Sequence, residues 1–198
     1  MPPKCMELLA SIGRRRRRVD RVSVRAVDPA SPLSGLSRET NIRRDRQGRW
    51  WNGADPITHP GLVHAFEGWL GRSPDGRLCL ENSIHWVHVT VEGAPYFVRH
   101  VRLEPGGLVG VLSGGAEEVL DLATLAEDDA GVLYVRVRGG SLWAQFDRAA
   151  QQGLAEWLGE DEAGPYLTLA GRVHRPRRVA SFEVLAEEDT PPSPGRSP

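Results

Sequence analysis

The chain has 198 residues, of which 40% are hydrophobic and 26% charged, and its formal net charge is −1. These values are typical of a globular protein and exclude one that binds nucleic acid over its whole surface. No apolar run approaches the roughly 18 residues that a membrane helix needs, and the N-terminal apolar stretch lacks a signal-peptide cleavage site. We therefore expect a cytoplasmic protein without a membrane span.

The two ends of the chain differ in composition from its centre. Residues 1–40 combine several prolines with an arginine block at Arg14–Arg18, and residues 181–198 are acidic and then rich in proline and serine. Neither end shows a sustained hydrophobic period, so we expect a disordered basic tail and a disordered acidic, proline-rich tail.

The first predicted element is a β-hairpin. Strands at 41–46 and 49–52 flank Gln47-Gly48, where glycine supplies the positive φ that a two-residue turn demands. In this register Arg44 lies opposite Trp51 on the neighbouring strand.

A helix follows the hairpin and begins at Pro60, a position where the missing N–H costs little. Apolar residues recur at helical spacing as far as Leu70, and Gly71 is expected to end the helix as a left-handed cap. After a turn at 74–76, the alternating pattern predicts strands near 77–81, 84–91, 97–103, 108–112 and 118–122.

A second hairpin, helix and strand are predicted further along the chain. Strands at 133–138 and 141–146 flank Gly139-Gly140, and a helix near 148–158 precedes a strand near 165–170. One face of this hairpin is apolar. The other face carries Tyr134, Arg136, Arg138 and Trp143.

Two short signatures occur twice in the same order. Arg44-x-Arg46-x-Gly48-x-x-Trp51 recurs as Arg136-x-Arg138-x-Gly140-x-x-Trp143, and Trp69-Leu70-Gly71 with Gly76 recurs as Trp157-Leu158-Gly159 with Gly164. Such repetition predicts a duplicated unit. We expect an α+β fold of two structural repeats, at 41–125 and 130–180, each an antiparallel β-hairpin, one helix and following strands, packed together.

The arginine and tryptophan pairs are the best candidates for ligand contact. A guanidinium facing an indole can hold an anion by its planar fork while the ring offers a stacking surface. The same pair can instead be a cross-strand cation–π contact worth about 0.5–1 kcal/mol, or simple packing. The candidates from this pattern are Arg44, Trp51, Tyr134, Arg136, Arg138 and Trp143.

Catalytic and metal-binding patterns are weak. His85 and His88 are three apart on a predicted strand and point to opposite faces, so no metal site and no cofactor is predicted. Ser113-Gly114-Gly115 is typical of a turn between strands, not of a nucleophile elbow. No catalytic residue is assigned, and an enzyme would need dispersed groups such as His88, Glu92 and His100.

With these elements placed, the chain resembles a bacterial family known only as a domain of unknown function, number 1285 in its series. The resemblance covers about residues 41–178 and implies a two-repeat α+β fold with a binding or signalling role. It adds Glu92 to the candidate ligand contacts. The motifs that carry it are Asp45-x-x-Gly48-x-Trp50 with Gly53 and Ile57, Phe66-x-x-x-Leu70, Val91-Glu92-x-Ala94-Pro95-Tyr96, and Leu133-Tyr134-Val135-Arg136-Val137-Arg138-Gly139-Gly140.

The leading functional hypothesis is a non-enzymatic binding or signalling module for an anionic small molecule or an acidic peptide. The alternatives are an enzyme with dispersed catalytic residues and a weak nucleic-acid binder that uses Arg14–Arg18. A pocket between the two hairpins would favour duplication for binding, whereas a dry junction would favour duplication for the fold.

Overall fold

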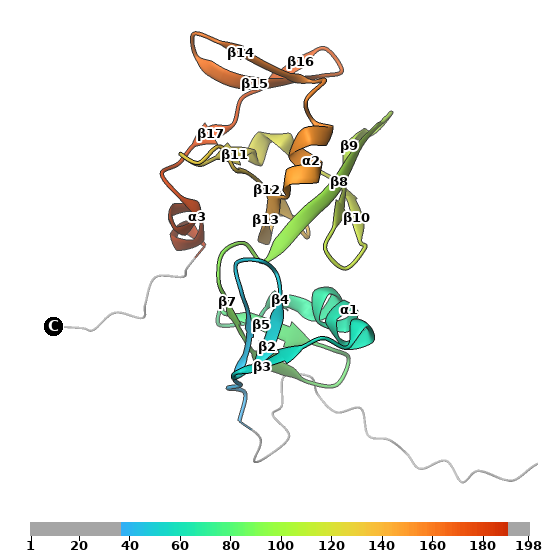
Figure 1. Ribbon diagram of the computed structural model, residues 1–198, viewed down its shortest axis with the longest axis vertical. Coiled ribbons are helices and arrows are strands. Elements are labelled where there is room, and N and C mark those ends of the chain that lie inside the picture. The colour runs from blue at the N-terminus through green and yellow to red at the C-terminus, as the bar shows by residue number, and fades with distance from the viewer. Residues whose placement is uncertain (1–36, 190–198) are drawn as a thin grey trace, which may run out of the picture.

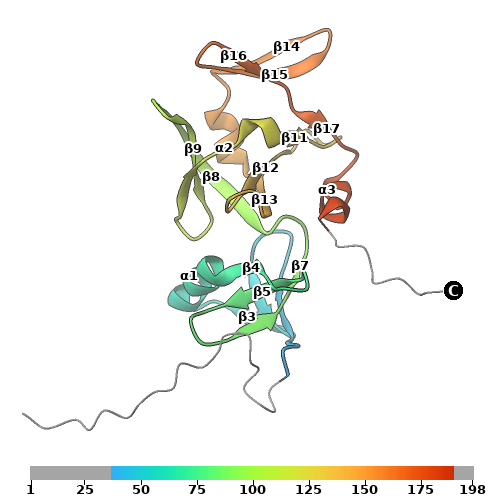
Figure 2. The same ribbon diagram turned by 180° about the vertical axis from the view of Figure 1, so that it is seen from behind.

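The structure, a computed structural model, describes residues 37–189. Within these residues it combines many short strands with three short α-helices, so the predicted α+β class is confirmed. Figures 1 and 2 show two lobes, one formed by the first part of the described chain and one by the rest. The arginine block at 14–18 lies outside the described residues. No helix within 37–189 is long and apolar enough to cross a membrane.

The first lobe contains two small sheets and one helix. Its elements are β1 (Ile42–Arg44), β2 (Trp50–Asn52), β3 (Asp55–Ile57), α1 (Pro60–Trp69), β4 (Leu70–Arg72), β5 (Leu78–Glu81), β6 (Trp86–His88) and β7 (Thr90–Val91). Strands β1, β2 and β3 pair antiparallel, and β7 joins them in parallel beside β1. Strands β4, β5 and β6 form the second sheet, directly after the helix.

The second lobe is built on a larger sheet. Its elements are β8 (Tyr96–Glu104), β9 (Gly107–Leu112), β10 (Glu117–Val119), a 3-10 turn (Leu122–Thr124), β11 (Ala126–Glu127), β12 (Leu133–Val137), β13 (Leu142–Phe146), α2 (Arg148–Gly153), β14 (Leu158–Asp161), β15 (Gly164–Leu169), β16 (Arg172–His174), β17 (Arg177–Arg178) and α3 (Phe182–Glu188). Seven strands take the order β10-β9-β8-β13-β12-β11-β17. Strands β14, β15 and β16 form a separate sheet at the far end of this lobe (Figure 1).

Strands β8, β9 and β10 were expected to complete the first unit, but they belong to the sheet of the second lobe. The cause is the parallel pairing of β8 with β13, which places Tyr96 beside Ala144. Both lobes do share an element order of hairpin, helix, three-stranded sheet and a last strand in a parallel pair. The repeat itself stays a prediction.

The register of the first hairpin differs from the predicted one. Arg44 lies opposite Trp50, and Arg43 lies opposite Trp51. Because side chains alternate between the faces of a strand, this one-residue shift exchanges the two tryptophans. Trp50 is buried and Trp51 is only half-buried. The predicted pair of Arg44 and Trp51 is therefore wrong.

The longer turn explains the shift. Asp45 accepts hydrogen bonds from the Gln47 and Arg49 amides at 3.0 and 2.9 Å, so five residues separate the strands instead of two. Gly48 has φ of 82°, and a Cβ there would lie 2.8 Å from the Phe97 ring. Glycine is needed at this position both for its conformation and for the close approach.

In the second hairpin the predicted pairing is confirmed, since Arg136 lies opposite Trp143. The predicted end of the first helix is wrong. Leu70 is already extended and pairs with Leu80, while Gly71 is a strand residue without positive φ. Strand pairing that buries Leu70 ends the helix there in place of a glycine cap.

The expected disorder of 181–198 is wrong for its first part. Residues Phe182–Glu188 form α3, which packs on the second lobe through the fully buried Leu185. Contact with the body of the protein, which sequence periodicity does not report, stabilises this short segment.

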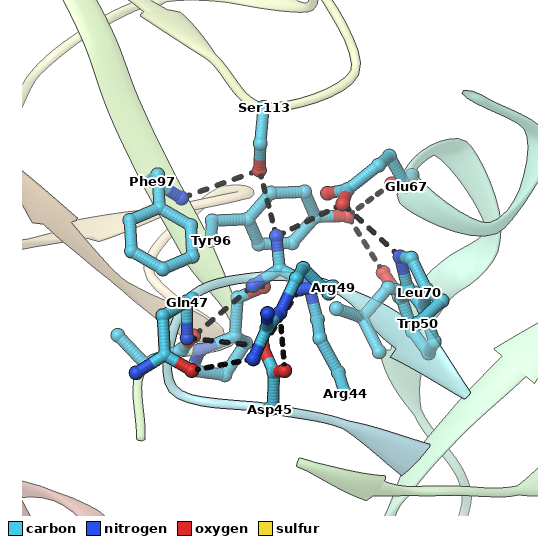
Figure 3. A network of polar contacts seen from close by, with 12 residues as sticks. Arg44, Asp45, Gln47, Arg49, Trp50, Glu67, Leu70, Tyr96, Phe97 and Ser113 are labelled. Carbon is cyan, nitrogen blue, oxygen red and sulfur yellow. Dashed lines mark hydrogen bonds and ion pairs between the residues drawn. The ribbon is translucent and has the colours of Figure 1, made fainter. Parts of the chain in front are cut away.

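A buried arginine lies where the lobes meet. Arg44 is fully buried, and its Nη2 donates to Glu67 Oε1 at 2.9 Å (Figure 3). Its Nη1 donates to the Pro95 carbonyl at 2.8 Å, and its Nη2 lies 3.4 Å from Ser113 Oγ. The indole of Trp50 donates to the same Glu67 oxygen at 3.1 Å. This network joins β1, β2 and α1 to the loop after β9.

Removal of one partner of this buried pair should destabilise the protein strongly. Glu67→Ala leaves the Arg44 charge buried without a counter-ion, so we expect a loss of about 3–5 kcal/mol in the free energy of unfolding. Urea denaturation measures it. The double variant Arg44→Met, Glu67→Leu should lose less than Glu67→Ala. Arg102→Ala, which removes two exposed ion pairs, should leave the urea midpoint nearly unchanged.

Candidate functional site

Arg44, the first predicted ligand contact, belongs to the core. Its terminal nitrogens donate to internal acceptors, and no part of the side chain reaches solvent. Burial lowers the pKa of this guanidinium, and the neighbouring Glu67 carboxylate opposes that effect. Arg44 holds the lobes together and offers no surface to a ligand.

Trp51 lies on β2 of the hairpin that carries Arg44, and Glu92 directly follows β7, the strand beside β1. The Arg43 and Arg49 guanidinium carbons lie 4.8 and 5.6 Å from the Trp51 ring centroid. Glu92 is exposed and pairs with Arg43 at 3.5 Å. Exposed pairs of this kind contribute little to stability. The role of Trp51 and Glu92 as ligand contacts stays a prediction.

Asp45 fixes the turn beneath this surface. Burial alone would raise the pKa of its carboxyl, but hydrogen bonds from the Arg49 amide, the Trp51 indole and the Arg49 side chain lower the pKa to about 2. Arg49 Nε lies 2.7 Å and Trp51 Nε1 3.0 Å from Asp45 Oδ2. The folded hairpin therefore stabilises the ionised form of the Asp45 carboxyl.

The second predicted face carries Tyr134, Arg136 and Trp143. The Arg136 guanidinium carbon lies 4.4 Å from the Trp143 ring centroid. Helix α3 covers this face, so both aromatic rings are buried. The Phe182 ring lies 5.3 Å from that of Tyr134, and Leu185 fills the same small apolar cluster. This face is therefore occupied by the chain itself.

A cavity of about 550 Å³ lies where the two lobes and α3 meet. Its wall comes from the β4–β5 hairpin, β7, the indole on β13 and α3. The wall residues that matter below are Arg72, Arg77, Val91, Trp143, Phe182 and Asp189.

Two arginines from different lobes converge on one carboxylate beside this cavity. Arg72 Nη2 lies 2.8 Å from Asp189 Oδ2, and Arg136 Nη2 bonds to Asp189 Oδ1. The carbonyls of Gly76 and Ser141 hold the Arg72 guanidinium at 2.7 and 3.1 Å. The Asp189 side chain is only 9% exposed. These contacts form a preorganised binding site for a carboxylate.

One donor at the cavity has no acceptor. The Trp143 indole N–H is buried and unpartnered. A buried donor left unpaired costs about 1–3 kcal/mol, and because this nitrogen is itself inaccessible it is not offered to the cavity. Arg77, also on the wall, is engaged by both carboxylate oxygens of Glu39 at 2.7 and 2.8 Å.

Two solved structures resemble this arrangement of elements. A DUF1285 family protein from Silicibacter pomeroyi DSS-3 covers 75% of this chain and 84% of its own, with 24% identity and a TM-score of 0.54. A DUF1285 family protein from Shewanella baltica OS155 covers 61% of this chain and 94% of its own, with 20% identity and a TM-score of 0.50. This chain has the DUF1285 fold. No protein-family model and no curated protein matches the sequence.

The DUF1285 likeness confirms, at the level of the fold, the resemblance predicted from the hairpin and strand motifs. The family is a domain of unknown function, so its name assigns neither a ligand nor a reaction. The chemistry of the site rests on the residues of this chain.

Other predicted groups lie elsewhere in the DUF1285 fold. Arg138 is exposed, has φ of 56° and lines a separate hollow of about 710 Å³. His88 lies 3.6 Å from Asp75, Glu92 pairs with an arginine on β1, and His100 lies on β8. No contact in the described part of the chain joins these three residues, and the dispersed catalytic set stays a prediction. Among residues 37–189, no group of three His, Cys, Asp or Glu side chains is arranged to hold a metal ion.

Two residues on the wall of this cavity were not predicted from the sequence. Arg72 lies on β4, where no strand was predicted, and Asp189 lies in the segment predicted to be disordered. A weak signal exists for the latter, since Ser181 precedes Phe182 and Leu185 at helical spacing, which is typical of a short capped helix.

The stability that Asp45 contributes should disappear in acid. Its carboxyl pKa is 3.8 ordinarily and about 2 in the fold, so the stabilisation is present above pH 4 and lost as the pH falls through about 2. Asp45→Asn should cost about 2 kcal/mol at pH 7 and less with each step from pH 4 towards pH 2. Urea unfolding of both proteins across this range measures the difference. A gap that does not narrow would contradict the assignment.

Proposed function

We propose that this protein is a non-enzymatic binding module that takes an anionic small molecule in the cavity between its lobes. The observation that carries the proposal is the convergence of Arg72 and Arg136 on the Asp189 carboxylate. A guanidinium presents a planar fork that matches carboxylate and phosphate groups. The Asp189 carboxylate therefore marks the position that a ligand's anionic group would take.

The cavity suits the rest of such a ligand. Its volume of about 550 Å³ falls within the range of about 300–1,000 Å³ typical of small-molecule sites. Val91 and Phe182 supply apolar wall, to which the Trp143 ring adds. A molecule with one carboxylate or phosphate and an apolar body matches these groups.

Binding is favoured over catalysis by the way the charged groups are engaged. Arg72 is paired with Asp189, Arg77 with Glu39, and Glu183 on the wall with Arg46. A ligand that exchanges with Asp189 leaves these pairs otherwise intact. We place this binding event in the cytoplasm, as the composition favours.

An anion that binds here should raise the melting temperature. At 100 times its Kd a ligand adds about 2.7 kcal/mol to stability, which for a chain of this length is a shift of roughly 5–10 °C. Differential scanning fluorimetry with citrate, succinate, inorganic phosphate and nucleotides measures it. A folded protein whose melting temperature none of these probes changes would count against the proposal.

The matched controls come from the hairpin on which Arg136 lies. Arg72→Ala and Arg136→Ala should each abolish the shift, because each removes half of the guanidinium pair. Arg138→Ala removes an exposed arginine of the same hairpin that does not line the cavity, and it should keep the shift. Equal loss in all three variants would indicate a non-specific effect of charge.

A further inference from the structure

Helix α3 lies on the second lobe as a bound peptide would. Figures 1 and 2 show it at the side of the molecule, after the last strand of the sheet and close to the end of the described chain. It covers the face of β12 and β13 that carries Tyr134 and Trp143. Only a short link, residues 179–181, joins it to the sheet.

The apolar contact of α3 is small and separate from the main core. Leu185 is fully buried, and Phe182 contacts Tyr134, but these residues form a cluster apart from the one that crosses both lobes. A helix of seven residues is too short to be stable by itself, so its structure depends on this contact. Such an element can exchange with a competitor that offers the same groups.

The two sides of this contact carry opposite charge. Carboxylates lie on the helix and its cap, at Glu183, Glu188 and Asp189, and guanidiniums lie on the body. The pairs are Arg46 with Glu183 at 2.9 Å, Arg177 with Glu188 at 2.7 and 2.9 Å, and both Arg72 and Arg136 with Asp189. Complementary charge of this kind selects a partner and fixes its register.

We infer that the face beneath α3 is a docking surface for an acidic amphipathic helix of another protein, which displaces α3. The partner would carry the pattern of α3: two apolar residues three apart, as at Phe182 and Leu185, and acids matching Glu183, Glu188 and Asp189. A longer helix gains intrinsic stability that α3 lacks. The inference rests on the proposed function in one respect, because both ligands use Arg72 and Arg136.

The tether gives α3 an advantage that an experiment must remove. A segment joined by a short link competes at an effective concentration on the order of millimolar, which hides binding by a free peptide. Leu185→Asp in the full chain should release α3, since it places a charge in the apolar cluster. The main core does not include Leu185, so the melting temperature and circular dichroism can verify that the rest remains folded.

Fluorescence anisotropy with a labelled peptide of residues 181–189 tests the inference. The Leu185→Asp protein should bind this peptide at least about tenfold more tightly than the wild type, because the tethered competitor is gone. A control peptide with Glu183→Gln, Glu188→Gln and Asp189→Asn should bind at least about tenfold more weakly. Adding Arg136→Ala to the Leu185→Asp protein should cause a similar loss.

A second variant tests the inference without altering the apolar cluster around Leu185. Asp189→Asn weakens the contacts with Arg72 and Arg136 and leaves the apolar contact in place. The Asp189→Asn protein should therefore also bind the acidic peptide more tightly than the wild type does. Absence of binding to both folded variants, or equal binding of acidic and neutral peptides, would overturn the inference. If small anions still raise the melting temperature through Arg72 and Arg136 in that case, the proposed function stands without it.

Discussion

The rest of the structure depends on the burial of one guanidinium. Arg44 carries its charge into the junction of the lobes, and a buried charge is tolerated only with a counter-ion and hydrogen bonds. Glu67 on α1 and the carbonyls that precede β8 supply these partners for the terminal nitrogens, whereas Arg44 Nε and Glu67 Oε2 are buried without one. These contacts tie the helix and the first hairpin to the chain between the lobes and to the loop after β9.

The sequence predicts the periodic part of this fold well. Alternation and helical spacing locate both hairpins and the start of α1 at Pro60, because burial of one face is a local property of the pattern. The register of the first hairpin was missed because Asp45 acts through its side chain, which binds turn amides and adds residues to the turn. The end of α1 was missed because strand pairing outweighs the glycine signal.

The candidate site, too, has a part that the sequence predicts and a part that it does not. Arg136 opposite Trp143 was predictable, since a tight turn sets their register. Arg72 and Asp189 were not, because their meeting depends on how distant segments pack. Contacts that join residues 72, 136 and 189 leave no periodic trace in a single sequence. What the sequence did identify is the chemistry of the face, a guanidinium beside an indole. The acid that meets this guanidinium is Asp189, which directly follows α3.

The doubled residues Arg43-Arg44 and Trp50-Trp51 have a consequence for the uniqueness of the fold. A hairpin that slipped by one residue would still bring Arg44 against an indole, so neither charge nor aromatic content distinguishes the two arrangements. Asp45 does distinguish the two arrangements. In a two-residue turn it would lie within the strand and lose the hydrogen bonds that it now accepts from the turn amides. The hydrogen bonds of Asp45 thus also fix the pairing of β1 with β2 in one register, and without Asp45 two registers of the same strands would compete.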